Sequence, residues 1–197
     1  CHACCTGMGS SIVLDPLDIV RISRGTGATF EALLAGKIQL NVVDGIILPN
    51  LKMAGEEEGC GFLTREGRCS IHPFRPGICR LFPLGRYYEE NGFRYFLQVH
   101  ECQKENRTKV KVKKWLDTPN LKNYEAYITG WHGFLIQLQE FIAAHPESAK
   151  AVSMDVLQRF YLTPYQTEEF YSEFFRRMDE AKKYIIAARQ GTEVPHL

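Results

Sequence analysis

Several features are missing from this sequence of 197 residues, and each absence excludes a class of protein. No apolar run reaches the roughly 20 residues of a transmembrane helix, because Arg, Lys, Glu or His interrupts the longest candidates. We therefore expect no membrane partner and a cytoplasmic location. The sequence also lacks a C-x-x-x-C-x-x-C run, a Gly-rich nucleotide loop and a recognisable Ser/His/Asp arrangement.

An excess of positive charge is missing as well, since the formal net charge is only +1. Such a balance gives no global attraction to nucleic acid or to an anionic surface. The one basic segment, residues 104–114, has no aromatic residues between its Lys and Arg side chains. We interpret this segment as a solvated face and expect no nucleic-acid partner.

Cysteine is absent from the last 95 residues, because all seven cysteines lie among the first 102. A role as small core residues does not explain this asymmetry, since the C-terminal part is equally apolar. Their odd number and the adjacent pair Cys4-Cys5 argue against a disulfide framework. Thiolates are soft ligands for zinc and for the iron of iron-sulfur clusters. We therefore predict that metal is the partner of these residues: Cys1, Cys4, Cys5, Cys60, Cys69, Cys79 and Cys102.

The first cysteines are spaced C-x-x-C, which lets two thiolates reach one metal from a tight turn. Neighbouring side chains of an extended backbone point to opposite sides. Cys4 and Cys5 are therefore predicted to serve two different metals, unless one of them is structural. His2 and His100 are further ligand candidates, although hydrogen bonding is the commoner role for such residues.

Two arginines flank Cys79 in the segment Arg75-Pro76-Gly-Ile-Cys79-Arg80. A guanidinium group stabilises clustered thiolates through charge-assisted hydrogen bonds. We therefore predict that Arg75 and Arg80 support the metal site from outside the ligand shell. The alternative is that they hold an anionic substrate.

These strings resemble a known family. Cys1-x-x-Cys4-Cys5, Cys60-x-Phe-Leu, Cys69-x-Ile-His and Arg75-Pro76-x-x-Cys79-Arg80-x-Phe-Pro are similar to the YkgJ-type cysteine-cluster family of zinc- or iron-chelating domains, over about residues 1 to 102. That family resembles the metal-binding part of flagellin lysine methylases, which are associated with an iron-sulfur cluster. The resemblance implies a further cysteine three residues before Cys1. It implies no ligand role for His72, because many members carry Tyr there.

The fold class predicted from the pattern is α+β. An irregular, metal-nucleated cysteine-rich half with a small antiparallel sheet is expected at residues 1–114, and an α-helical region packed against it at 115–197. Asp15-Pro16 predicts a helix start, and residues 29–34 a second short helix. Two strands are expected around Asp44-Gly45, and a hairpin over residues 85–100 turning at Asn91-Gly92.

Three helices are expected in the C-terminal half. The first begins near Thr118-Pro119 and carries an apolar stripe, the second spans residues 148–161, and the third begins with a capping box at Thr163. The third is expected to bury residues from Phe170 to Ile185. Its aromatic residues are predicted to form core, although a partner groove is the alternative.

Three functions are compatible with the sequence. The first is a metal-binding protein that holds an iron-sulfur cluster, of the 4Fe-4S type, or zinc in a structural or redox role. The second is an enzyme using a nearby cluster, such as a protein lysine methyltransferase-like activity, which only the resemblance suggests. The third is a zinc-stabilised module that binds a protein partner through the C-terminal helices.

Overall fold

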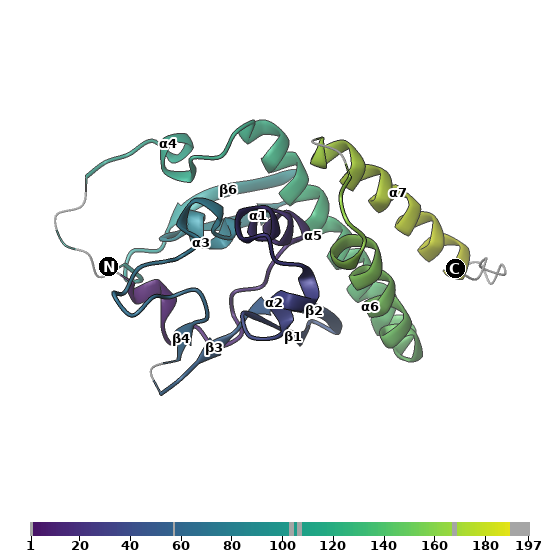
Figure 1. The fold of residues 1–197 in the computed structure, drawn as a ribbon. Helices are drawn as coiled ribbons and strands as arrows, with labels where there is room; N and C mark the ends of the chain where they lie inside the picture. The colour runs from purple at the N-terminus through teal and green to yellow at the C-terminus, as the bar shows by residue number, and fades with distance from the viewer. Residues whose placement is uncertain (1, 57, 103–104, 106–107, 167–168, 190–197) are drawn as a thin grey trace. The chain divides into compact units, whose positions relative to one another are not determined.

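The computed structural model describes residues 2–56, 58–102, 105, 108–166 and 169–189 (Figure 1). It confirms the α+β class, with small antiparallel two-stranded sheets and a helical C-terminal half. The elements follow one another as α1 (Pro16–Thr26), α2 (Phe30–Leu34), β1 (Ile38–Val43), β2 (Ile46–Leu51), β3 (Met53–Ala54), β4 (Gly59–Cys60), α3 (Gly77–Leu81), β5 (Leu84–Glu89), β6 (Gly92–Leu97), α4 (Val112–Leu116), α5 (Leu121–Ala144), α6 (Ala149–Leu157) and α7 (Phe170–Arg189).

The chain forms two compact units. One holds residues 1–41 and 48–121, and the other holds residues 42–47 and 122–197. We call them the cysteine-rich unit and the helical unit. The tip of the β1–β2 hairpin thus belongs to the helical unit. A division of the sequence at one position would assign this tip to the other unit. The division into domains at residues 114 and 115 stays a prediction.

The first elements form where the sequence predicts them. Asp15 caps α1, and its side chain and that of Asp18 accept each other's backbone N–H groups in a capping box, at 2.9 and 3.2 Å. The side chain of Thr29 caps α2 in the same way. At the β1–β2 turn, Asp44 and Gly45 both have positive φ angles, 49° and 86°, as a tight two-residue hairpin turn requires.

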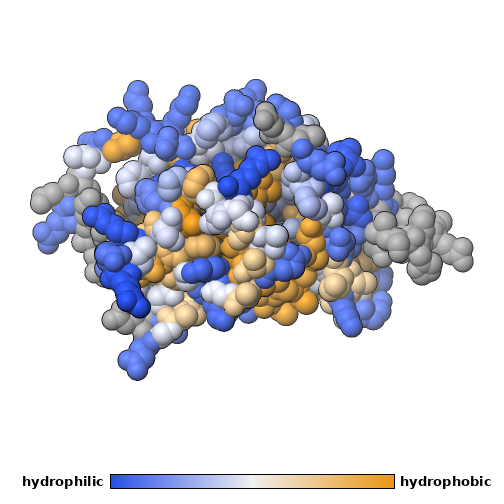
Figure 2. Space-filling view, viewed as in Figure 1, coloured by the Kyte–Doolittle hydropathy of each residue, from blue (hydrophilic) through white to orange (hydrophobic). Residues whose placement is uncertain are grey.

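Strand β1 exposes one of its faces. Leu40 and Val42, two residues apart, are 39% and 70% exposed. In Figure 2, hydrophobic residues (orange) gather in the area where Figure 1 places the β1–β2 hairpin, whereas hydrophilic residues (blue) line most of the visible edge.

The β5–β6 hairpin forms as expected, but its turn lies one residue earlier. Glu89 pairs with Gly92, so the two-residue loop is Glu90-Asn91 rather than Asn91-Gly92. Gly92, with a φ of 145°, is the first residue of β6. Towards the end of the hairpin, Leu97 and Val99 are 52% and 59% exposed.

The helical unit is built around α5, with α6 and α7 alongside it (Figure 1). The buried stripe of α5 is wider than predicted, since it also includes Tyr127, Phe134 and Phe141. Tyr127 meets Phe174 of α7 with ring centroids 4.6 Å apart, and Trp131 meets Phe160 at 5.2 Å. Aromatic residues therefore form the core of this unit, each pair adding to the energy of apolar burial.

Gly130 of α5 allows a close approach by a side chain rather than by another backbone. A Cβ atom on Gly130 would lie 3.1 Å from the Phe175 ring, so α7 packs here by an aromatic side chain. Helix α6 continues into a single π-helical turn, Gln158–Leu162, which ends the predicted second helix at the expected place.

The expected start of the last helix is wrong. Helix α7 begins at Phe170, and Thr163 instead ends the preceding π-helical turn in an extended conformation. The cause is Arg177, which is 4% exposed and donates hydrogen bonds to the carbonyl oxygens of Arg159, Thr163 and Pro164 at 2.6 to 2.8 Å. These bonds stabilise the segment as a turn. The predicted burial of Ile185 falls outside the described side chains.

Replacing Arg177 is expected to destabilise the protein strongly. The side chain of its partner Glu173 is only 11% exposed and keeps the Gln166 N–H as a donor, so Arg177→Met leaves one oxygen of this carboxylate and three carbonyl oxygens without the Arg177 donor. Breaking such a pair costs about 3–5 kcal/mol. Urea unfolding measures the loss.

The neighbouring Arg176 provides the matched control. It pairs with Glu180, but the two side chains are 61% and 43% exposed. Arg176→Met should therefore cost less than about 1 kcal/mol. Equal losses for the two variants would contradict the role assigned to Arg177.

Candidate metal centre

Backbone pairing brings the first cysteines beside Cys60. Thr6 forms an antiparallel bridge with Gly59, and the N–H of Gly7 donates to the carbonyl of Glu58 at 3.1 Å. Cys5 and Cys60 therefore lie next to paired residues of adjoining segments. Figure 1 shows the N-terminal segment (purple) near β4.

A tight loop returns the chain from Cys60 to Cys69. Leu63 bridges Cys69, and the N–H and hydroxyl of Ser70 both donate to the carbonyl of Phe62 at 2.9 Å. The Lys37 ammonium fixes the start of this loop by donating to the carbonyl of Gly61 at 2.5 Å.

Cys79 is positioned by helix α1. The carboxylate of Asp18, only 2% exposed, accepts a 2.7 Å hydrogen bond from the N–H of Gly77 at the start of α3. Burial raises the pKa of Asp18 to about 8, with Asp15 adding to the effect. Sequence reasoning missed Asp18. The Asp15-x-x-Asp18 spacing is a signal for the capping box, but nothing in the sequence indicates the bond to Gly77.

The segment before α3 also packs closely on α1. Residues His72–Phe74 form a short 3-10 helix, and a Cβ atom on Gly25 would lie 2.2 Å from the Phe74 ring. Only glycine leaves room for this ring. The approach holds the segment leading to Cys79 against the end of α1.

Five thiols line one cavity of about 190 Å³. They are half-buried and come from three stretches of the chain: Cys4 and Cys5, then Cys60 and Cys69, then Cys79. The side chains of His2 and His72 also line it, whereas His100 and the half-buried Cys102 are not among its lining residues. Cys1 lies outside the described residues. The predicted ligand roles of Cys1 and Cys102 stay predictions.

The adjacent pair is arranged differently from the sequence expectation. Residues Ala3–Cys5 form a 3-10 helix rather than an extended strand, so both thiols reach the same cavity. The hydrogen bond from the Cys5 thiol lowers the pKa of Cys4 to about 6 and raises that of Cys5. The lowered pKa favours the thiolate form of Cys4, which is the form that binds metal. The premise for two separate metals does not hold, and the number of metals stays open.

Burial governs the deeper thiols. It raises the pKa of Cys60 and of Cys79, and at Cys79 the charge of Asp18 adds to the effect. A metal that binds these thiols must displace their protons. Only a strongly thiophilic ion can compete with the protons in this way.

The two arginines lie in different places. Arg75 lines the thiol cavity, and its charge is among the causes that lower the pKa of Cys4. Arg80 is not among the residues lining it; its guanidinium donates to the carbonyl of Pro73 and, at 3.5 Å, to that of Asp117. Arg75 Nη1 contacts the His72 ring, and burial followed by the two arginine charges lowers the pKa of His72.

The donor set fits a thiophilic metal in kind. Four cysteines complete a zinc shell or hold a 4Fe-4S cluster, and five are within reach of one cavity. Among the described residues, however, no three Cys, His, Asp or Glu side chains already converge closely enough to hold an ion. The thiols share a cavity without being closed around one point, so they must reorient on binding.

A cavity lined by half-buried thiols offers the soft donors that a cysteine-rich metal-chelating domain requires. A family model described as "CxxCxxCC: Putative zinc- or iron-chelating domain" matches residues 1–115, and the chain belongs to this family. No match is found among curated proteins or among solved structures. Within the described part of the chain, no helix combines the length and apolarity needed to cross a membrane.

Asp18 should be required for the position of Cys79. Asp18→Ala removes the acceptor of the Gly77 N–H and, in the capping box, the acceptor of the Asp15 N–H, which costs about 1–3 kcal/mol for a buried donor left unsatisfied. We expect a lower urea midpoint and weaker metal binding in titrations. Asp18→Asn, which keeps one acceptor oxygen, should lose less. Equal behaviour of Asp18→Ala and the wild type would contradict this role.

Proposed function

We propose that this protein binds an iron-sulfur cluster or zinc through Cys4, Cys5, Cys60, Cys69 and Cys79. The observation that carries the proposal is that all five thiols line one cavity of the cysteine-rich unit. Membership of a zinc- or iron-chelating family supports metal binding in general. Four of the five thiols supply a full ligand set, and the fifth is available as a neighbour or an exchangeable ligand.

The size of the cavity favours the cluster over a single ion. A water molecule occupies about 30 Å³ in the liquid, and the cavity measures about 190 Å³. The space is thus about six times the volume of one water molecule, which leaves room for a group larger than one ion. A 4Fe-4S cluster bound there would supply one-electron redox chemistry. The chain's own residues would bind the irons, shield the site by burial and, through the Arg75 charge, favour the anionic thiolates.

An enzyme is the second candidate. The observation that favours it is a cationic cleft that shares His72 and Arg75 with the thiol cavity, so a small anionic molecule could lie beside the metal. A protein side-chain methyltransfer reaction, such as lysine methylation, is one activity of this class. Enzymatic activity would require a substrate that occupies both spaces at once.

Metal content and absorption spectra test the proposal. Protein purified without oxygen should carry about four irons with matching sulfide and absorb visible light. Protein purified in air should retain zinc in the same thiols. Folded protein free of both metals under anaerobic conditions would contradict metal binding.

Cysteine variants test the ligand set. Cys69→Ser and Cys79→Ser should each weaken metal binding by more than about tenfold, because even outer contacts of a metal site contribute 10- to 100-fold. Cys102→Ser is the matched control, since Cys102 is a half-buried thiol outside the lining of the cavity. If it loses as much metal as Cys69→Ser, Cys102 is a ligand and the five-thiol assignment is wrong.

A further inference from the structure

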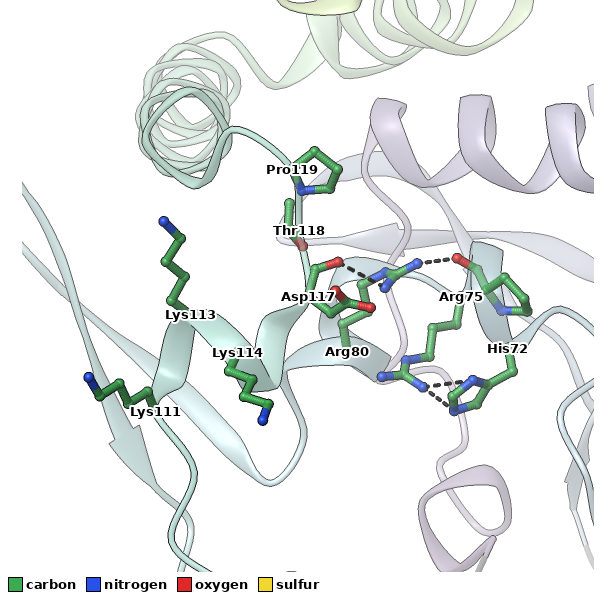
Figure 3. A pocket seen from close by; sticks show the side chains of 10 residues that line it. His72, Arg75, Arg80, Lys111, Lys113, Lys114, Asp117, Thr118 and Pro119 are labelled. Atoms are coloured by element: carbon green, nitrogen blue, oxygen red, sulfur yellow. Dashed lines mark hydrogen bonds between the residues drawn. The ribbon is translucent and has the colours of Figure 1, made fainter.

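A second, wider cavity of about 770 Å³ lies within the cysteine-rich unit (Figure 3). We call it the cationic cleft. Its walls come from the segment before and within α3, and from α4 with the turn that follows. The lining residues are His72, Pro73, Arg75, Arg80, Lys111, Lys113, Lys114, Asp117, Thr118 and Pro119.

Positive charge dominates the cleft. Two arginines and three lysines line it, against the single carboxylate of Asp117. The chain as a whole carries a net charge of only +1, so this concentration is local. Five cations around one concave surface raise the concentration of anions there, and salt weakens the effect because the lysines are exposed.

The charged groups are held by contacts between α3 and α4. The Trp115 indole donates to the carbonyl of Phe82 at 3.2 Å, which fixes α4 beside the end of α3. Arg80 donates to the carbonyls of Pro73 and Asp117, so its guanidinium spans the cleft from one wall to the other. The arginine side of the cleft is therefore organised by hydrogen bonds to backbone oxygens.

Figure 3 separates the lysines into two kinds. The Lys114 side chain extends on the side of the arginines, whereas Lys111 and Lys113 point away from them. Arg75 turns one nitrogen to His72, and its buried Nε has no hydrogen-bond partner among the described residues. Arg75, Arg80 and Lys114 thus form the inner group, with Lys111 and Lys113 as outer charges.

The shape and lining restrict the class of ligand. A volume of about 770 Å³ exceeds the need of one phosphate and lies in the range of small-molecule sites, roughly 300–1,000 Å³. The described lining includes no Phe, Tyr or Trp, and its one ring, the His72 imidazole, is engaged by Arg75, so the cleft lacks the row of stacking rings that single-strand binding uses. Guanidinium forks match phosphate oxygens, and an ammonium adds a mobile point charge.

We propose that the cationic cleft binds a chain of linked phosphates, such as the di- or triphosphate part of a small molecule. The inner group binds the first phosphate and the outer lysines the following ones. This site is separate from the thiols, shares only His72 and Arg75 with their cavity, and does not depend on a bound metal.

Calorimetric titration with inorganic triphosphate, pyrophosphate and orthophosphate tests the proposal on the full chain. Affinity should rise with the number of phosphates and fall between low and physiological salt. Lys114→Gln should weaken triphosphate binding about tenfold, as expected for one lost charge-assisted contact. Arg80→Lys, which keeps the charge but removes the fork, should also weaken it. If Arg80→Lys fails to fold, Lys114→Gln alone still decides.

Arg65→Gln is the matched control, because Arg65 is exposed in the same unit and does not line the cleft. It should change the affinity less than about twofold. The proposal is overturned if triphosphate shows no saturable binding up to about 5 mM, or if Arg65→Gln weakens binding as much as Lys114→Gln. Citrate binding as tight as that of triphosphate would also overturn it, as would tighter binding of a single-stranded oligonucleotide.

Discussion

The hydrogen bond between the buried Asp18 carboxylate and the Gly77 N–H is the constraint on which the cysteine-rich unit depends. It joins the first turn of α1 to the first residue of α3, two elements between which α2 and the strand pairs β1–β2 and β3–β4 lie in the sequence. Cys79 and Arg80 both lie within three residues of that bond. The positions of Cys79 and of the Arg80 guanidinium therefore both depend on one buried carboxyl group.

In the thiol cavity, pairing between short backbone segments does much of the positioning of the cysteines. Bridges at Thr6–Gly59 and Leu63–Cys69 place the segments that carry Cys5, Cys60 and Cys69 side by side. The thiols nevertheless stop short of a closed ligand group in the described residues. Closing it requires side-chain rotation and the loss of thiol protons, so ligand binding and local ordering are one event.

Much of the fold could be predicted because its signals are local. Two helix starts and one hairpin turn form as expected, because each is determined by residues within three or four positions of one another: Asp15-Pro16, Thr29 and Asp44-Gly45. The family and its metal class were likewise indicated by cysteine spacing. The last helix was misplaced because Thr163 has a capping sequence, but Arg177, 14 residues away, binds its carbonyl instead. The cationic cleft is lined by residues 72–80 and 111–119. Their proximity could not be predicted, because the spacing of residues within a motif does not indicate contacts between distant segments.

The Arg177 contacts also bear on how this sequence can vary. Its hydrogen-bond acceptors in the turn are carbonyl oxygens of Arg159, Thr163 and Pro164, and every amino acid carries that group. The turn can therefore exchange those side chains without losing the contacts, provided its backbone path is kept. Position 177 has no such freedom, because only arginine offers several donors in a planar fork. The conformation of this turn should therefore constrain the identity of Arg177, which lies outside the turn, more than the identities of the residues in it.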